Sequence, residues 1–250
     1  CNVLLRGWST TCAKIPTTGS TGMISGISKN TVIAGLLLAG AIWTACPCQA
    51  APPDGTATQA LDAAALVASL KRTAPARTAY AEVRFSGLFD RPLILHGELA
   101  YLGPGKLGKR VDSPYHEQTT IADGEATVLR GTGAPRVFAL GQAPELEGFL
   151  RGFTALLGGD ASALARDFEM TAQGTDAHWR LLLKPRDSRL AKRMDVIEVD
   201  GAGSTSRCFR SHDTDGDVSV LLVDALATAK LPTRPSPAWI DALCRGIKLP

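Results

Sequence analysis

The stretch Pro-Leu-Ile-Leu-His-Gly-Glu-Leu-Ala-Tyr at residues 92–101 decides the fold, because every second position carries a residue of one face. The members of that face are Leu93, Leu95, Gly97, Leu99 and Tyr101. A period of two places alternate side chains on opposite sides of a β-strand. Residues 80–86 alternate in the same way, with Ala81, Val83 and Phe85 between polar neighbours. Both stretches therefore predict strands with one buried face.

Further strands are expected on either side of a helical segment. Asp123-Gly124 lies between two of them and is a typical hairpin turn. The expected strands cover residues 107–112, 116–121, 125–130, 136–140, 168–171, 178–184, 195–199, 206–210 and 217–223.

Helical periodicity marks the other elements. The first helix is expected over 58–72, with Thr58 as its cap and Pro75 beyond its end. The second covers 144–157, where Pro144 suits the first turn and Gly158 the end. A shorter helix over 161–166 and a helix carrying Cys244 complete the set. One antiparallel sheet with inserted rather than alternating helices is an α+β pattern.

The N-terminal part has the pattern of an export signal. Residues 23–50 contain Lys29, an uncharged apolar run and small residues before a cleavage site after Ala50, which predicts a signal peptide and a protein outside the cytoplasm. Residues 1–22 are interpreted as translated upstream or disordered sequence, and 51–250 as a single domain. A genuine N-terminal extension, an uncleaved membrane anchor and a lipoprotein modified at Cys46 are the alternatives.

Charge and cysteine content limit the choice of partners. Residues 51–250 carry 24 basic and 24 acidic residues and no basic patch, which argues against nucleic acid. Cys208 and Cys244 are the cysteines that remain after the expected cleavage. In an oxidising compartment they predict one disulfide, with two free thiols as the alternative.

No arrangement of residues indicates catalysis. A Gly-x-Ser-x-Gly motif is absent and the four histidines are scattered, so we expect neither catalytic residues nor a cofactor. The segment Asp213-Thr-Asp-Gly-Asp217 superficially resembles a calcium loop, but the sixth and twelfth positions are Val218 and Asp224 rather than Gly and Glu. We interpret it as a hairpin turn and expect no metal site.

Such a sheet can bury its apolar face on helices, or it can leave a lipid-sized cavity beneath them. The apolar residues of the 144–157 helix could pack on the sheet in the first case or cover the cavity in the second.

Three segments, in order, resemble the LolA family of periplasmic lipoprotein carriers. They are Gly97-Glu-Leu-Ala-Tyr-Leu-Gly-Pro104, Ile121-Ala-Asp-Gly124 and Trp179-Arg-Leu-Leu-Leu-Lys-Pro185. The similarity spans roughly residues 58–225. It implies an unclosed antiparallel β-barrel, or half-barrel, of about 10–11 strands with an α-helical lid over an apolar cavity.

The resemblance also implies a function and a site. A monomeric periplasmic carrier would take the acyl chains of a lipoprotein or other lipidated cargo from an inner-membrane transporter to an outer-membrane acceptor. The ligand-binding residues expected in the cavity and the lid are Phe85, Leu93, Leu95, Leu99, Tyr101, Val128, Leu146, Phe149, Leu150 and Phe153.

One position departs from the family. Gly103 stands before Pro104, where the family carries an Arg that takes part in opening and closing the lid. A divergent branch that carries a glycolipid or an aryl-polyene lipid is therefore an alternative to lipoprotein cargo. A second alternative is a non-catalytic envelope adaptor with a filled half-barrel, and an enzyme is the third. A register error of one residue in any strand would invert its expected cavity face.

Overall fold

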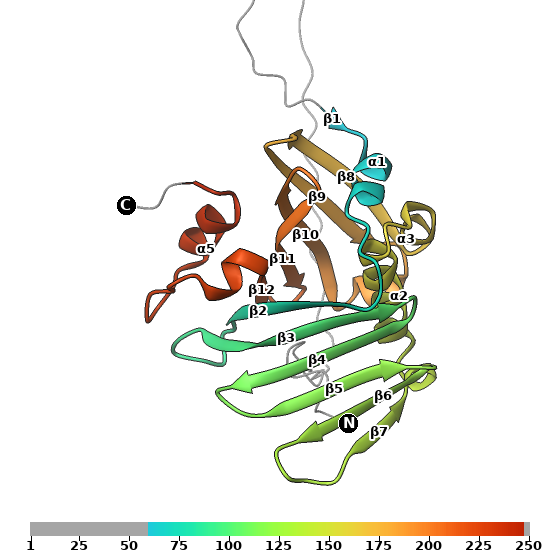
Figure 1. Cartoon of the computed structure of the whole chain (residues 1–250), viewed down its shortest axis with the longest axis vertical. Helices are drawn as coiled ribbons and strands as arrows, with labels where there is room; N and C mark the ends of the chain where they lie inside the picture. The colour runs from blue at the N-terminus through green and yellow to red at the C-terminus, as the bar shows by residue number, and fades with distance from the viewer. Residues whose placement is uncertain (1–59, 248–250) are drawn as a thin grey trace, which may run out of the picture. The chain divides into compact units, whose positions relative to one another are not determined.

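The computed structural model describes residues 60–247 (Figure 1). The strands are β1 (Ala60–Leu61), β2 (Ala76–Phe85), β3 (Leu93–Gly103), β4 (Lys106–Ser113), β5 (Glu117–Ala122), β6 (Glu125–Arg130), β7 (Arg136–Ala139), β8 (Phe168–Thr175), β9 (His178–Pro185), β10 (Met194–Ala202), β11 (Thr205–Asp213) and β12 (Val218–Val223). The helices are α1 (Ala63–Ser69), α2 (Pro144–Leu157), α3 (Ala161–Asp167), α4 (Ser188–Ala191) and α5 (Pro237–Cys244), with short 3-10 helices η1 (Leu140–Gln142) and η2 (Asp224–Thr228). The expected signal peptide and upstream segment lie outside the described residues.

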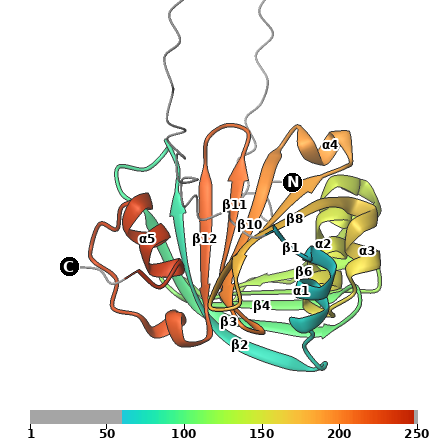
Figure 2. The same ribbon diagram turned by 90° about the horizontal axis from the view of Figure 1, so that it is seen from above.

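All the described strands form one antiparallel sheet of twelve strands in the order β1-β8-β9-β10-β11-β12-β2-β3-β4-β5-β6-β7. The pairing of β12 with β2 joins the late strands to the early ones. The edge strands β1 and β7 are not neighbours in this order, so the sheet is unclosed. Figure 2 shows how it bends, with β10–β12 running away from the plane of β2–β4. The α+β half-barrel expected from the sequence is confirmed.

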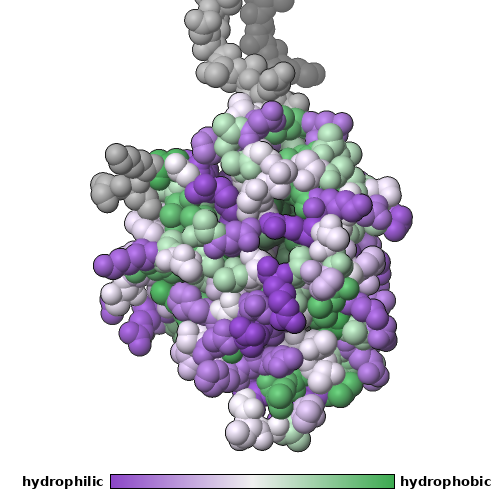
Figure 3. Space-filling view, viewed as in Figure 1, coloured by the Kyte–Doolittle hydropathy of each residue, from purple (hydrophilic) through white to green (hydrophobic). Residues whose placement is uncertain are grey.

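The bend gives the sheet a concave and a convex face. Helices α2 and α3 lie on the concave side, whereas α5 lies on the convex side of β11 and β12 (Figure 2). The larger core lies on the concave side and includes Phe168, Leu181 and Leu183. Figure 3 shows the outer surface over β3–β6 as largely hydrophilic.

The hairpin turns have the expected chemistry. Asp123 and Gly124 have φ angles of 52° and 80° and connect β5 to β6 in register. Both central residues of a type I′ turn require positive φ, which explains the Asp-Gly pair. The acidic segment 213–217 is a hairpin turn between β11 and β12, closed by a hydrogen bond from the Asp213 N–H to the Asp217 carbonyl.

A disulfide and an ion pair hold the C-terminal segment on the convex face. Cys208 on β11 and Cys244 on α5 form the expected disulfide, with Cα atoms 5.6 Å apart. Both cysteines are fully buried in a second core with Ala81, Val83 and Ile240. The Arg180 guanidinium on β9 donates to the Asp241 carboxylate on α5 at 2.9 Å. The outer face of β11, β12 and β2 is therefore buried as well as the inner one.

The first helix begins later than expected. Its N-cap is Asp62, whose carboxylate accepts from the Ala64 and Ala65 N–H groups, and the helix covers Ala63–Ser69. The predicted cap, Thr58, lies outside the described residues. The chain before Asp62 instead pairs as β1 with β8, which prevents Leu61 from joining the helix.

Candidate functional site

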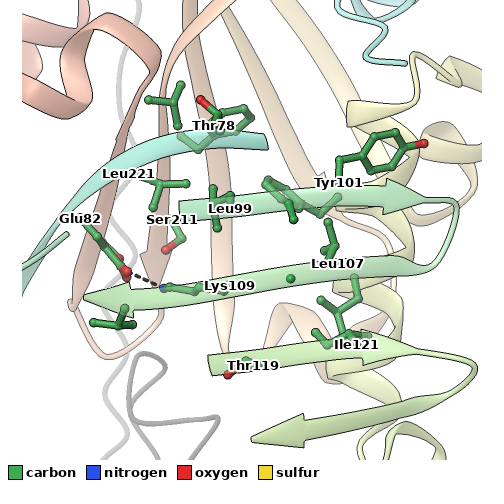
Figure 4. A pocket seen from close by; sticks show the side chains of 18 of the residues that line it. Thr78, Glu82, Leu99, Tyr101, Leu107, Lys109, Thr119, Ile121, Ser211 and Leu221 are labelled. Carbon is green, nitrogen blue, oxygen red and sulfur yellow. Dashed lines mark hydrogen bonds and ion pairs between the residues drawn. The ribbon is translucent and has the colours of Figure 1, made fainter. Parts of the chain in front are cut away.

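A cavity of about 680 Å³ lies on the concave side of the sheet. Its walls come from β2–β5, from β10–β12 and from one side of α2. This volume falls within the ~300–1,000 Å³ typical of small-ligand pockets. Figure 4 shows side chains of several strands converging on it.

One half of the cavity is apolar. Leu107 and Ile121 are opposite each other on β4 and β5, and they pack with residues of α2 in one cluster. The α2 residues that line the cavity are Leu146, Phe149, Leu150, Phe153 and Leu157. The Phe149 and Phe153 rings stack with centroids 5.8 Å apart, and Phe153 meets the Phe209 ring of β11 edge-on at 5.5 Å. Helix α2 therefore contacts both the early strands β4 and β5 and the late strand β11.

Helix α2 is held in place by neutral and charged contacts. The Gly105 N–H of the β3–β4 turn donates to the Thr154 hydroxyl at 3.2 Å. Arg151 pairs with Asp167 of α3 at 2.6 Å. A Cβ at Gly152 would lie 2.2 Å from the Phe168 ring, so this glycine allows the helix to approach β8. The contact between the β3–β4 turn and α2 is thus made by a backbone amide two residues after Gly103.

Seven of the ten residues expected at the site line the cavity. They are Leu93, Leu99, Tyr101, Leu146, Phe149, Leu150 and Phe153. Leu95 and Val128 lie on the cavity side of the sheet, opposite Glu82 and Thr119, but neighbours cover them completely or nearly so and they contribute no cavity surface.

The prediction for Phe85 is wrong. Phe85 packs with the second core, on the side of the sheet that α5 covers. The residues of β2 that face the cavity are the alternate ones, including Glu82 and Arg84. Because α5 buries the outer face of β2, the apolar residues of this strand are needed there rather than in the cavity.

The other half of the cavity is polar, and its centre is Glu82. The residue is 5% exposed, and its carboxylate accepts hydrogen bonds from the Arg84 Nε at 2.7 Å, the Ser219 hydroxyl at 2.8 Å and the Lys109 Nζ at 2.5 Å. Figure 4 shows Glu82, Lys109 and Ser211 on one side of the cavity and Tyr101, Leu107 and Ile121 on the other. Burial alone would raise the pKa of Glu82, but the charges of Lys109 and Arg84 lower it to about 2.

A second ion pair extends this polar half. Arg130 on β6 donates to the Glu117 carboxylate on β5, and its guanidinium lies 5.3 Å from the centre of the Tyr115 ring. Glu117, Tyr115 and Arg130 all line the cavity. The polar half thus contains three cationic side chains and two carboxylates.

Sequence reasoning missed this polar half. In an alternating strand, Glu82 and Arg84 look like solvent-facing residues, and Lys109 lies in a stretch with little apolar periodicity. The one signal was the position of Glu82 and Arg84 on a strand whose other face is entirely apolar at 81, 83 and 85. That signal becomes informative only when another segment is known to cover the apolar face.

The described residues contain no helix that is both long and apolar enough to span a membrane. Within the same range, no three His, Cys, Asp or Glu side chains gather in a way that could hold a metal ion.

Comparison with known proteins agrees with this architecture. Residues 55–247 match the family described as outer membrane lipoprotein carrier protein LolA-like. No curated protein matches the chain significantly.

Many solved structures are similar to this chain, and two of them are described here. A LolA superfamily protein from Nitrosomonas europaea is 11% identical, with a TM-score of 0.38, covering 69% of this chain and 96% of the other. LprF from Mycobacterium bovis is 9% identical, with a TM-score of 0.32, covering 70% of this chain and 93% of the other.

The family match covers most of the chain and includes every described strand and helix. LolA-like proteins are periplasmic, bind lipids or lipoproteins, and are generally non-catalytic. This chain belongs to the LolA-like family of outer membrane lipoprotein carrier proteins.

Proposed function

We propose that this protein is a periplasmic carrier that binds the acyl chains of a lipoprotein or another lipidated cargo in its cavity and carries it towards the outer membrane. The observation that supports the proposal is the apolar half of the 680 Å³ cavity between the sheet and α2. Each CH₂ group removed from water contributes ~0.8 kcal/mol, so a soluble carrier needs such a cavity to hold acyl chains.

The proposal includes the export of the protein and the path of its cargo between the two membranes. The signal peptide at 23–50 would direct export, with cleavage after Ala50. A monomer would then receive the cargo from an inner-membrane transporter and pass it to an outer-membrane acceptor. No catalytic step is needed, because transfer follows the difference in affinity between carrier and acceptor.

A substitution in α2 tests the proposal. Phe149 is half-buried, lines the cavity and stacks on Phe153. In Phe149→Asp a carboxylate would enter the apolar half, where an unpaired charge is strongly disfavoured. Val137 on β7 is 57% exposed and does not line the cavity, so Val137→Asp is the matched control.

The assay is titration of the protein, exported as the full chain and purified from the periplasm, with a fluorescent fatty-acid probe. We expect the wild type and Val137→Asp to bind the probe equally and Phe149→Asp to bind at least about tenfold more weakly, a loss of ~1.4 kcal/mol. Far-UV circular dichroism checks that the variant is folded. Equal binding by a folded Phe149→Asp would contradict the proposed site. Absence of binding to a delipidated wild type would favour the adaptor alternative.

A further inference from the structure

The loop between β2 and β3, residues 86–92, carries the most exposed large apolar side chain of the described residues. Leu88 is 82% exposed, and the adjacent Phe89 is 54% exposed. The other exposed large apolar side chains in the described range, Leu102, Val137 and Ile247, lie singly on β3, on β7 and after α5. Single exposed apolar residues are ordinary, whereas two neighbouring ones at a loop tip indicate a contact with something outside the molecule.

This loop stands clear of the rest of the protein and has hydrogen bonds of its own. The Leu88 N–H donates to the Ser86 hydroxyl at 3.3 Å, and the Phe89 N–H donates to the Ser86 carbonyl at 3.2 Å. A Cβ on Gly87 would meet nothing within 4 Å. Figure 1 shows the loop projecting beyond the ends of the neighbouring strands. Leu88 and Phe89 are therefore held outward rather than folded onto the core.

The loop also lies at the edge of the cavity. Phe89 lines the cavity although more than half of its surface is exposed, so the cavity reaches the molecular surface at this residue. The loop precedes Leu93 at the start of β3, whereas the turn at the other end of β3 contacts α2 through Gly105. The loop and this contact with α2 are therefore at opposite ends of β3.

The position of the loop suits the two halves of the cavity. Glu82, at the centre of the polar half, lies on β2 shortly before the loop, while the apolar half lies beside α2. A lipid with its acyl chain in the apolar half would have its polar part on the side of the loop. This is the side that would face the polar surface of a bilayer during exchange.

A bilayer fits this loop better than a folded protein partner does. A stable protein interface takes about 20–30 residues from each partner, far more than a tip of two apolar side chains supplies. Leucine and phenylalanine are residues that enter the boundary between lipid head groups and acyl chains. The exposed Asp90 and Arg91 beside them carry opposite charges, so the tip has no net charge that would select an anionic surface.

We propose that Leu88 and Phe89 insert into the surface of a lipid bilayer and hold the opening of the cavity against it. The partner is the lipid itself, and anionic head groups are not required. This inference rests on the proposed carrier function, in which the loop would keep the acyl chain out of water as it passes between bilayer and cavity. Two side chains give weak and reversible binding, because even one myristoyl chain binds a membrane only marginally.

The experiment measures binding of delipidated protein, exported as the full chain and purified from the periplasm, to phosphatidylcholine vesicles by flotation at millimolar lipid. We expect the wild type to bind and Leu88→Asp to bind at least about tenfold more weakly, a loss of ~1.4 kcal/mol. Val137→Asp, at an exposed apolar residue of β7 outside the cavity lining, is the matched control and should bind like the wild type. Leu88 does not line the cavity, so Leu88→Asp should keep the wild-type affinity for the fatty-acid probe when no vesicles are present.

A second pair of variants locates the contact. The tryptophan emission of Leu88→Trp, taken as the difference from the wild type, should move to shorter wavelength when vesicles are added. Val137→Trp should show no such shift. Including phosphatidylglycerol in the vesicles should change the binding of the wild type by less than about twofold, because the contact is apolar.

The outcomes separate this inference from the carrier function. A wild type that binds the probe but no vesicles would refute the membrane contact, assign the loop to a protein partner and leave the carrier function intact. A delipidated wild type that binds vesicles but no probe would refute the carrier function instead. Equal vesicle binding by the wild type and Leu88→Asp would overturn the role of the loop. Binding only to vesicles that contain phosphatidylglycerol, abolished by salt, would show charge-driven adsorption and overturn it as well.

Discussion

Replacing Cys208 and Cys244 together with alanine should lower the free energy of unfolding by about 4 kcal/mol. The disulfide joins residues 36 positions apart, and closing a loop of that length removes conformational entropy from the unfolded chain worth ~4 kcal/mol. Both side chains are fully buried beside Ile240, so the smaller alanines also lose packing. The disulfide therefore contributes a large part of the ~5–15 kcal/mol that is typical of a folded domain.

The assay is equilibrium unfolding in urea, monitored by tryptophan fluorescence. Wild type treated with a reductant should lose most of this free energy but stay somewhat more stable than the double variant, because it keeps the packing of the buried thiols, and the reductant should not affect the double variant. A loss below about 1 kcal/mol would refute the view that the bond holds the C-terminal segment on the convex face. So would a double variant as stable as the oxidised wild type.

Two further predictions concern residues of β2 and β3. The pKa of Glu82 is lowered from 4.5 to about 2, so its ion pairs contribute stability that is fully present above pH 4.5 and is lost as pH falls towards 2. The stability advantage of wild type over Glu82→Gln should therefore shrink by about 3 kcal/mol across that window in urea titrations, and a constant difference would contradict the assigned pairing. Gly97→Ala should destabilise severely, by more than about 3 kcal/mol, because a Cβ at Gly97 would lie 1.8 Å from the Arg110 carbonyl oxygen. Gly87→Ala, which meets nothing within 4 Å, is its control in thermal unfolding, and similar melting temperatures for both would contradict the close approach of β3 and β4.

Local signals predicted the elements well. The bounds of β6 and α2 agree with those expected, because an Asp-Gly turn precedes the strand, Pro144 begins the helix and Gly158 caps its end. The cavity face of β3 was also predicted, since Leu93, Leu99 and Tyr101 all lie on it. In these segments the local pattern and the tertiary environment agree.

The orientation of β2 could not be predicted from its own residues. Phe85 belongs to an apolar set that packs under α5, a segment about 150 positions later in the chain. Both faces of this strand are covered, one by α5 and one by the cavity wall. The rule that apolar residues face the core therefore does not determine which face of β2 lines the cavity.

The polar half of the cavity could not be predicted either, because it also depends on contacts between separate strands. Glu82 and Lys109 are on different strands, and they meet only because β2, β3 and β4 pair in the observed register. Neither residue lies in a recognisable sequence motif, and a charged residue in a strand is more often exposed than buried. The apolar half was easier to predict, because the face of α2 repeats at helical spacing.

The most direct test of the central claim is native mass spectrometry of the protein purified from the periplasm without detergent. We predict a bound species of lipid mass that disappears after organic extraction and is regained when an acyl lipid is added. A clean mass of the protein alone, with no uptake of added lipid, would contradict the account of the cavity as a lipid-binding site.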